Sequence, residues 1–249
     1  MAQDKIYIYG KHSVLEALRS QSRAVEKVFI SQEEENEELN NLLKKTRVSV
    51  EKYSPTAIFP GIDKNTPHQG IIAQISTDKL VHPYKEFVEG LIVTTDTALA
   101  LLGEIQDPQN VGAIIRSAAA FGISGVLIPE HNQASITGAV IKASSGMAFR
   151  VPLVSIGNVN TTLRDLKERG FWIYGLDETA TTTLSKEVFD APALFVLGNE
   201  AKGIREKTRE ACDILLSIPM NSQCESLNVS TSAAIAFYEW STEHPNALK

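Results

Sequence analysis

The pattern of apolar and polar positions divides the chain into two parts. In the first part, alternating segments predict strands and amphipathic segments predict helices. The predicted strands are Lys5–Tyr9, Val25–Ile30, Val48–Tyr53 and Gly70–Ile75, and the predicted helices are Ser13–Leu18 and Glu33–Lys45. The second helix has an acidic start and a basic end, which suits the helix macrodipole. Strands that alternate with helices predict a small α/β domain over residues 1–77.

The second part, residues 98–249, carries continuous apolar runs in place of alternating ones. They are Leu99–Ile105, Gly125–Pro129, Phe171–Leu176, Ala193–Leu197 and Ile214–Ile218, with helical stretches between most of them. Such runs are typical of parallel strands buried on both faces of a sheet. Residues 78–97 contain Pro83 and several charges without a sustained period, so an ordered linker is expected there. The predicted fold class is α/β, with a parallel sheet in the second domain.

Three of the predicted strands end in turns that contain polar residues, Gly or Pro. The turns are Asp107-Pro108-Gln109-Asn110, Gly198-Asn199-Glu200 and Pro219-Met220-Asn221. Ligands of open α/β sheets bind outside the carboxyl ends of the strands. The three turns therefore predict one composite site.

The first turn leads into a helix that is predicted to begin near Asn110. Its buried face would consist of Val111, Ile114, Ile115 and Ala118. Gly112 lies one turn before Arg116 on the same face, and helical side chains lean toward the N-terminus. Arg116 is therefore expected to lie across Gly112 and to reach the loop that holds Asn110. The alternative is that Asn110 only caps the helix and that Arg116 is a surface cation.

The other two turns also have a functional and a purely structural interpretation. Glycines around Glu200 permit close approach of a ligand to the backbone, but the same residues suit a tight turn with an exposed carboxylate. The third turn continues through Ser226 and Asn228 into a helix rich in small residues. These two polar residues either take part in the site or serve only as helix caps.

Composition and charge exclude several other classes. The chain has 249 residues, 43% of them hydrophobic and 22% charged, which is ordinary for a globular protein. It contains no apolar run of eighteen residues and no secretory signal. Cys212 and Cys224 cannot form a disulfide framework, which favours a reducing, cytoplasmic location. The five histidines have no metal-ligand spacing, and no G-x-G-x-x-G, P-loop or G-x-S-x-G motif occurs.

The net charge of −6 argues weakly against a generic nucleic-acid-binding protein. A polyanionic partner would have to be held by a few well-placed cations and not by a bulk positive field.

Together, the three turns resemble the SpoU (TrmH-like) family of RNA ribose 2′-O-methyltransferases, within the knotted SPOUT superfamily. The motifs D-P-x-N-x-G-x-x-x-R, L-G-x-E-x-x-G and I-P-M…S-L-N-V-S occur in order within residues 98–240. Ile8–Val14 and His68–Ala73 are similar to the accessory substrate domain of the branch that includes the large-subunit rRNA guanosine 2′-O-methyltransferases.

The resemblance implies a C-terminal trefoil knot, S-adenosylmethionine as methyl donor, no metal, and a homodimer with active sites near the subunit interface. It places the family's functional positions on Asn110, Arg116, Glu200, Ser226 and Asn228. It places the donor pocket on the backbone around Leu197, Gly198, Ile218, Met220 and Leu227. An apolar stripe on the last helix is expected to serve the dimer, or else the core of a single chain; it consists of Ala233, Ala234, Phe237 and Trp240.

The expected function is methyl transfer from S-adenosylmethionine to a ribose 2′-hydroxyl of structured RNA, with guanosine in large-subunit rRNA as the expected target. Arg116 is expected to hold phosphate and stabilise the developing alkoxide, because a guanidinium group rarely deprotonates. Glu200 would orient Arg116 or Asn110, whereas Ser226 and Asn228 would order the donor loop and the substrate.

Residues 1–76 of the small domain are expected to select the RNA. Three alternatives stay open: the same chemistry on tRNA, a non-catalytic RNA-binding or antibiotic-resistance-type accessory protein, and a small-molecule α/β enzyme. The last would need a nucleophile constellation that the sequence lacks.

Overall fold

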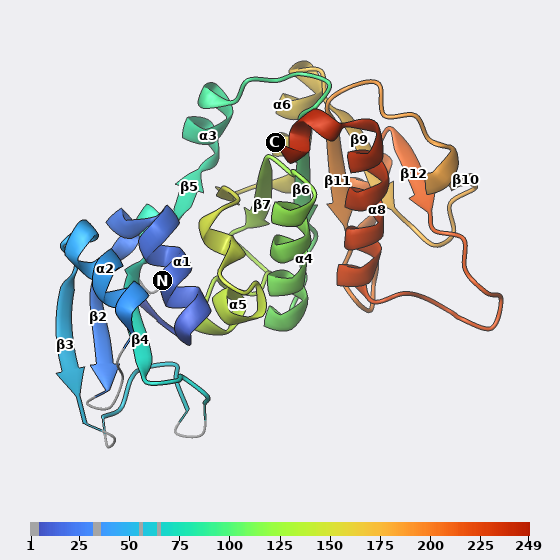
Figure 1. Ribbon diagram of the computed structural model, residues 1–249. Coiled ribbons are helices and arrows are strands. Elements are labelled where there is room, and N and C mark those ends of the chain that lie inside the picture. Colours follow the sequence, from blue (N-terminus) through green and yellow to red (C-terminus); the bar gives the residue numbers. More distant parts are fainter. Residues whose placement is uncertain (1–4, 32–35, 55–56, 64–65) are drawn as a thin grey trace.

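The structure is a computed structural model that describes residues 5–31, 36–54, 57–63 and 66–249. It contains a four-stranded sheet in the order β1-β4-β2-β3 and an eight-stranded sheet in the order β10-β12-β9-β11-β6-β7-β8-β5. The smaller sheet lies at one end of an elongated molecule, and the last strands of the larger sheet lie at the other (Figure 1).

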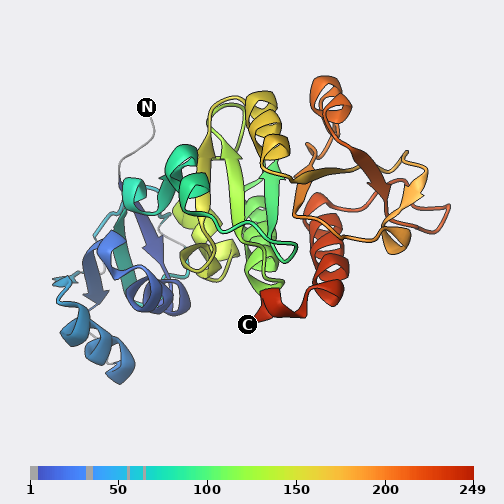
Figure 2. The same ribbon diagram turned by 90° about the horizontal axis from the view of Figure 1, so that it is seen from above.

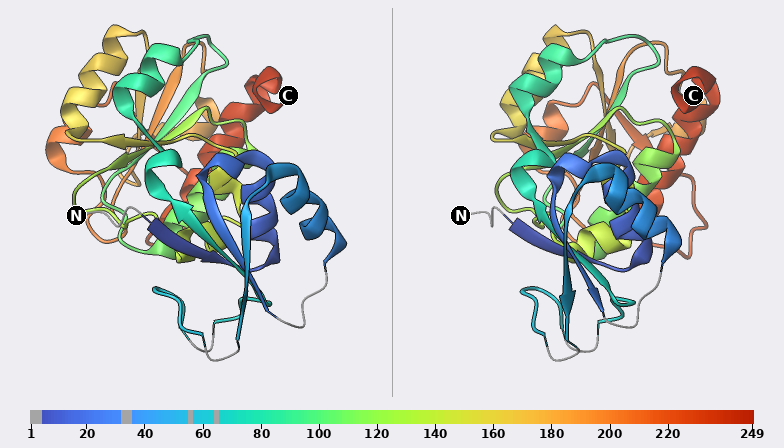
Figure 3. Two further views of the ribbon diagram at one scale, coloured as in Figure 1. Left: turned by 90° about the vertical axis from the view of Figure 1, so that its left-hand side faces the viewer. Right: turned by 60° about the vertical axis from the view of Figure 1, so that its left-hand side comes forward.

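The small domain has mixed strand pairing. Its strands are β1 (Lys5–Tyr9), β2 (Val25–Ser31), β3 (Ser49–Tyr53) and β4 (Ile71–Ser76). β4 runs antiparallel to β1 and β2, and β3 runs parallel to β2. The two helices α1 (Lys11–Ser20) and α2 (Glu37–Thr46) lie together on one side of this sheet (Figure 3). All four predicted strands and the first helix are confirmed to within a few residues.

The start of α2 follows from a side-chain cap. Asn36 Oδ1 accepts a hydrogen bond from Leu39 N at 3.0 Å, which satisfies one of the unpaired N–H groups of the first turn. Glu33, where the sequence predicted the start of this helix, lies outside the described residues.

The large sheet is parallel at every pairing between its strands. Its strands are β5 (Val81–Pro83), β6 (Ala98–Leu102), β7 (Gly125–Pro129), β8 (Leu153–Ile156), β9 (Trp172–Leu176), β10 (Thr182–Thr183), β11 (Ala193–Leu197) and β12 (Ile214–Ser217). Every residue of β6, β7 and β11 is buried, which explains their continuous apolar sequences. The five predicted runs are confirmed as strands, whereas β5, β8 and β10 were not predicted.

Helices cover both faces of the large sheet (Figure 2). α4 (Pro108–Ala120), α5 (Gly138–Ala143) and α8 (Val229–Glu243) contribute to the core on one face. α3 (Tyr84–Gly90) and α6 (Val159–Glu168) contribute to the core on the other face. The short helix α7 (Glu206–Glu210) packs against α6. The 3₁₀ segments are η1 (Ser22–Ala24), η2 (Thr77–Lys79), η3 (Met147–Phe149), η4 (Leu184–Lys186) and η5 (Pro245–Leu248).

The segment 78–97, expected to be an ordered linker, is ordered and also contributes to the large sheet. β5 pairs in parallel with β8, and Val88 of α3 is only 4% exposed. The sequence Val81-His82-Pro83 is too short to produce an apolar run, so it gave no strand signal.

The first turn of α4 differs from the sequence prediction. The helix begins at Pro108, and the Asp107 carboxylate caps it by accepting a hydrogen bond from Gln109 N at 2.8 Å. Asn110 therefore lies inside the first turn, and its side chain is available for tertiary contacts. A proline at the first helical position suits this start, because its missing N–H would be unpaired there anyway.

Gly112 has a different role from the one predicted. A Cβ at Gly112 would lie 2.4 Å from Ala143 Cβ and 2.8 Å from Val140 O, so this face of α4 is filled by α5. Arg116 therefore cannot lie across Gly112, and the prediction that it reaches the loop of Asn110 in this way is wrong. The glycine is needed instead because it lets two helices approach closely.

The apolar stripe on α8 is part of the core within one chain. Ala233, Phe237 and Trp240 are fully buried, and the Phe237 ring packs 5.8 Å from the Phe195 ring of β11. Of the two interpretations of this stripe, a dimer surface or the core of a single chain, the second is therefore correct for these three residues. They are not available as the expected dimer surface.

The small domain packs against α5 and η3 of the large domain. A Cβ at Gly138 would lie 2.2 Å from Tyr7 O, so the first turn of α5 lies directly against β1. The buried Glu16 carboxylate of α1 accepts a hydrogen bond from Arg150 Nε at 2.6 Å. This ion pair joins the two domains.

The strand pairings do not test the trefoil knot, which stays a prediction. In the described part of the chain, no helix is both long enough and apolar enough to cross a membrane.

Candidate active site

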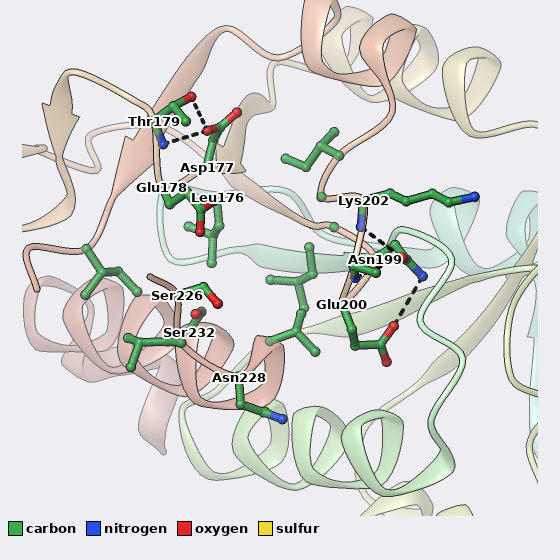
Figure 4. Close-up of a pocket in the computed structure, with 18 of the residues that line it drawn as sticks. Leu176, Asp177, Glu178, Thr179, Asn199, Glu200, Lys202, Ser226, Asn228 and Ser232 are labelled. Carbon is green, nitrogen blue, oxygen red and sulfur yellow. Dashed lines mark hydrogen bonds between the residues drawn. The ribbon is translucent and has the colours of Figure 1, made fainter. Parts of the chain in front are cut away.

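A cavity of about 690 Å³ lies at the carboxyl ends of β9, β11 and β12 (Figure 4). Its walls include all five residues predicted for the donor pocket, namely Leu197, Gly198, Ile218, Met220 and Leu227. Glu200, Ser226 and Asn228 also line it, whereas Asn110 and Arg116 do not. The structure thus brings together two of the three predicted turns as walls of one cavity.

The turn after β11 is shaped by close backbone packing. A Cβ at Gly198 would lie 2.4 Å from the carbonyl carbon of Gly203, so only glycine fits at this position. Asn199 and Gly203 exchange two backbone hydrogen bonds of 2.9 Å. The Asn199 Oδ1 atom also accepts hydrogen bonds from the N–H groups of Ala201 and Lys202. These contacts close the turn and present the Glu200 side chain at its tip.

The Glu200 carboxylate connects this turn to the start of α4. Its Oε1 atom accepts hydrogen bonds from Asn110 Nδ2 at 3.1 Å and from Asp107 N at 3.3 Å. Its Oε2 atom accepts from Gln106 N at 3.4 Å. A carboxylate beside the N-terminus of a helix is also favoured by the helix dipole.

These contacts fix the charge of Glu200. Burial by itself raises the pKa of the carboxyl, but hydrogen bonds from backbone N–H groups and from the Asn110 amide outweigh it, so the net pKa lies below its usual value. Glu200 is therefore an ionised hydrogen-bond acceptor near neutral pH and a poor proton acceptor for chemistry.

Asn110 links the second turn to the third. Its Oδ1 atom accepts a hydrogen bond from Asn228 Nδ2 at 2.9 Å, and the residue is only 8% exposed. Asn228 Oδ1 in turn accepts from Ser230 N at 2.8 Å and caps α8. Because the Glu200 carboxylate can only accept hydrogen bonds, Asn110 must present its Nδ2 to Glu200 and its Oδ1 to Asn228. Each donor in this series of hydrogen bonds therefore points toward Glu200. Asn228 therefore both caps a helix and orders the site.

The other predicted site residues are placed less centrally. Ser226 is exposed and lines the cavity beside Asn228 (Figure 4). Arg116 is exposed, and its side chain makes no hydrogen bond or ion pair with the part of the chain that the structure describes. It follows Asn110 by six residues, so it projects from α4 about 120° away from Asn110 around the helix axis. Within one chain, Arg116 points away from the Glu200–Asn110 contact.

One wall of the cavity was not predicted. Asp177, Glu178 and Thr179 follow β9 and face the turn of Glu200 across the cavity (Figure 4). Asp177 accepts hydrogen bonds from Thr179 N at 2.8 Å and from Arg209 Nε at 2.6 Å. The signal was available, since a polar turn follows the predicted strand Phe171–Leu176 just as polar turns follow the strands before the other motifs.

The sequence of the chain matches a class of RNA methylases. Residues 98–238 match the SpoU rRNA methylase family, and residues 7–80 match the domain described as RNA 2′-O ribose methyltransferase substrate binding. The chain belongs to the SpoU rRNA methylase family and is a methyltransferase, as the three motifs predicted.

Similar proteins of this family match nearly the whole chain. The 23S rRNA (guanosine-2′-O-)-methyltransferase RlmB of Nitrosomonas europaea is 34% identical, with 96% of this chain and 92% of the relative covered. RlmB of Xylella fastidiosa strain 9a5c is also 34% identical, with 94% of each chain covered. The crystal structure of the SpoU methyltransferase AviRb from Streptomyces viridochromogenes in complex with the cofactor AdoMet has a TM-score of 0.83 at 22% identity, covering 98% of this chain and 92% of that one. This last likeness shows that the fold is shared.

Proposed function

We propose that this protein transfers a methyl group from S-adenosylmethionine to the 2′-hydroxyl of a guanosine ribose in 23S rRNA. The observation that carries the proposal is the hydrogen-bonded chain Glu200–Asn110–Asn228, which joins all three motifs beside the cavity. The rRNA target is supported by the RlmB relatives, which match this chain along almost its whole length.

The cavity fits the methyl donor. Its volume of about 690 Å³ lies within the range of roughly 300–1,000 Å³ that is usual for small-molecule sites. Leu197, Ile218 and Leu227 offer apolar surface for an adenine ring, with Gly198 and Met220 contributing backbone to the same wall. Asp177 and Glu178 offer carboxylates for hydroxyl and ammonium groups. When bound there, S-adenosylmethionine supplies a methyl group that its sulfonium already activates.

The side chains of this protein have to position the ribose hydroxyl and favour loss of its proton. Glu200 fixes the Asn110 amide, whose second N–H has no partner among the described residues and can donate to a substrate oxygen. Asn228 donates to the Oδ1 atom of the same Asn110 amide. Ser226 lies beside Asn228 in the loop that lines the S-adenosylmethionine cavity. Of the two roles expected for Glu200, orientation of Asn110 is the one that its contacts support.

Arg116 enters this mechanism through a homodimer. In one chain its guanidinium is exposed and points away from Asn110, so we infer that it contributes to the site across the interface between two copies. There it would hold the substrate phosphate and stabilise the developing alkoxide. Light scattering at micromolar concentration tests the dimer, and a monomer would contradict it.

Mixing two inactive variants tests the shared site. Mixed dimers of Arg116→Ala and Asn110→Ala chains should recover activity if the two residues act in one site from different copies. If both act from the same copy, the mixture should stay inactive.

RNA selection is assigned to the small domain, which matches the substrate-binding domain of the family. Because rRNA is made and assembled in the cytoplasm of bacteria, we place the protein there. The tRNA alternative and the non-catalytic alternative are both outcomes of the experiment below.

The experiment uses RNA from a strain that lacks the gene. The purified protein, S-adenosylmethionine with a labelled methyl group, and separated 23S rRNA or tRNA are incubated, and ribose methylation is mapped by primer extension. Methylation of one guanosine in 23S rRNA is the expected result. Label in tRNA alone would favour the tRNA alternative, and no label in either RNA would favour a non-catalytic binding protein.

A further inference from the structure

A second cavity lies at the same edge of the large sheet and has no part in the function proposed above. It has a volume of about 470 Å³ and is formed at the carboxyl ends of β6, β7 and β11 and by the loop that follows β8. Its polar residues include Glu104, Asn132, Asn160, Arg205, Glu206 and Lys207. Ile204 lines both cavities, so the two share a wall.

The position of this cavity follows from the strand order. The chain leaves β6 for β7 and β8 on one side, and later places β11 on the other side of β6. Crevices outside such a reversal point are where open α/β sheets bind ligands. Next to Ile204, the loops 103–106 and 199–205 are joined by a 2.8 Å hydrogen bond from Asn199 Nδ2 to Glu104 O. A ligand in the second cavity would therefore lie directly beside the turn that carries Glu200.

The rim of the second cavity is held in an unusual backbone conformation. Glu104 has a φ of 64° and Asn132 a φ of 55°, in the left-handed region that L residues rarely adopt, although asparagine does so more often than glutamate. The two loops are fastened together by Gln133, whose side chain exchanges hydrogen bonds of 2.8 and 2.9 Å with the backbone of Ile105. Such conformations persist only where the surroundings enforce them, and they are frequent at ligand sites.

The polar atoms that face the cavity are partly unpaired. Glu104 Oε1 forms an ion pair with Arg205 at 2.6 Å, whereas Oε2 has no hydrogen-bond partner among the described residues. Asn160 Oδ1 accepts a hydrogen bond from Thr208 at 3.4 Å, whereas its Nδ2 has none in the described part of the chain. The site therefore offers a free carboxylate oxygen of Glu104 beside free amide and guanidinium donors, and Glu206 adds a second carboxylate to its rim.

This combination matches the edge of one nucleobase. Leu101, Val159 and Val196 provide apolar surface against which a flat ring can pack. Guanine carries N–H donors at N1 and N2 next to the acceptors O6 and N7. The carboxylate of Glu104 can accept from the donors while Arg205 donates to the acceptors. Adenine presents an amino group where guanine has O6, so it would place a donor against Arg205.

We propose that the second cavity binds an unpaired guanine base of the RNA substrate, next to the ribose at the first cavity. Sequence-specific RNA recognition commonly uses such splayed-out bases. Lys207 at the exposed rim would meet an adjoining phosphate. The inference rests on the proposed function, because it takes RNA as the substrate of the first cavity.

The test measures nucleotide binding to the full chain by ligand-observed NMR. Saturating S-adenosylhomocysteine fills the first cavity, and guanosine 5′-monophosphate is compared with adenosine 5′-monophosphate. The guanine nucleotide is expected to bind at least tenfold more tightly than the adenine nucleotide. Equal affinity for the two nucleotides would overturn the proposal.

Variants locate the binding. Glu104→Gln should lower the affinity for guanosine 5′-monophosphate at least tenfold, and Arg205→Ala, whose side chain is 66% exposed, offers a second change that spares the fold. Glu130→Gln is the matched control, because this exposed carboxylate follows β7 and lines neither of the two cavities. Unchanged affinity in both cavity variants would contradict the assignment.

The two proposals can fail separately. If the protein methylates rRNA but binds the guanine and adenine nucleotides equally well, only the proposal of the base site is overturned. Guanine-specific binding without methyl transfer to any RNA would overturn only the proposed function.

Discussion

Asn228 donates a hydrogen bond from Nδ2 to Oδ1 of Asn110 over 2.9 Å, although the two residues are separated by 118 positions in the sequence. The same Asn228 side chain caps α8 through its Oδ1 atom. Its two ends therefore have separable roles, one in helix stability and one in the ordering of the site.

Asn228→Asp should separate these two roles. Aspartate is a good N-cap, so the melting temperature should stay close to that of the wild type, but a carboxylate cannot donate to Asn110. The single-turnover methyl-transfer rate should fall by roughly a hundredfold, the scale of losing one fixed donor in an active site. Asn228→Ala is the companion variant, which should lose the same activity and in addition about 1 kcal/mol of stability. Normal activity in Asn228→Asp would contradict the role of the hydrogen bond.

Glu200 should make stability depend on acid pH. Its pKa is lowered in the folded state because donated hydrogen bonds outweigh burial, so its contribution is complete above the unfolded value of about 4.3 and is lost as the pH falls through the folded value. The difference in unfolding free energy between the wild type and Glu200→Gln should therefore be constant from pH 8 to 6 and shrink below about pH 4. Urea titrations across this range measure it. A difference that grows toward acid pH would show that the sign of the shift is wrong.

Arg116→Lys tests whether Arg116 acts in the transition state or only in binding. The substitution keeps the charge but loses the planar fork of donors. We expect the single-turnover rate at saturating RNA to fall by roughly a hundredfold or more, with donor affinity nearly unchanged. If the residue only anchors phosphate, saturating RNA should restore most of the rate, since uniform binding changes KM and not kcat.

Glu16→Gln should weaken the attachment of the small domain. Burial raises the pKa of this carboxyl, but hydrogen bonds from Arg150 and Ser20 outweigh it and lower the net value. Loss of the charge should cost about 1.5–3 kcal/mol, the usual value for hydrogen bonds to charged groups. The exposed pair Lys27–Glu51 provides the control, since Glu51→Gln should cost less than about 1 kcal/mol. Equal effects of the two variants would exclude a special role for the Glu16–Arg150 contact.

Gly112→Ala should push α4 and α5 apart. The added methyl group would meet Ala143 and the backbone of Val140, and overpacking of this kind costs about 1–3 kcal/mol. Gly90→Ala is the control, because nothing lies within 4 Å of its added methyl group. Thermal unfolding of the two variants measures the difference. Stability of Gly112→Ala equal to the wild type would refute the close-packing explanation.

The buried strands were predictable because a strand that is buried on both faces of a sheet consists of an uninterrupted run of apolar residues. Gly125–Pro129 and Ala193–Leu197 were predicted with their observed bounds for this reason. β5 was not, because its three residues depend on pairing with β8 and not on their own hydrophobicity.

The site was predictable to the extent that it depends on local sequence. The motif residues in the second and third turns were correctly expected to lie near one another, because parallel strands end at one edge. The partners of Gly112 were not, because they depend on how α4 lies against α5. Side-chain spacing along one helix contains no information on those neighbours.

The hydrogen bond between Asn110 and Asn228 can form only late in the synthesis of the chain. The first half of the site is translated more than a hundred residues before Asn228 and α8, its other half. A nascent chain that has emerged only as far as β12 holds Asn110 and Glu200 but has nothing to fix the far end of the Asn110 amide. We therefore expect methyl transfer to begin only after the segment 228–243 has been translated and has left the ribosomal exit tunnel.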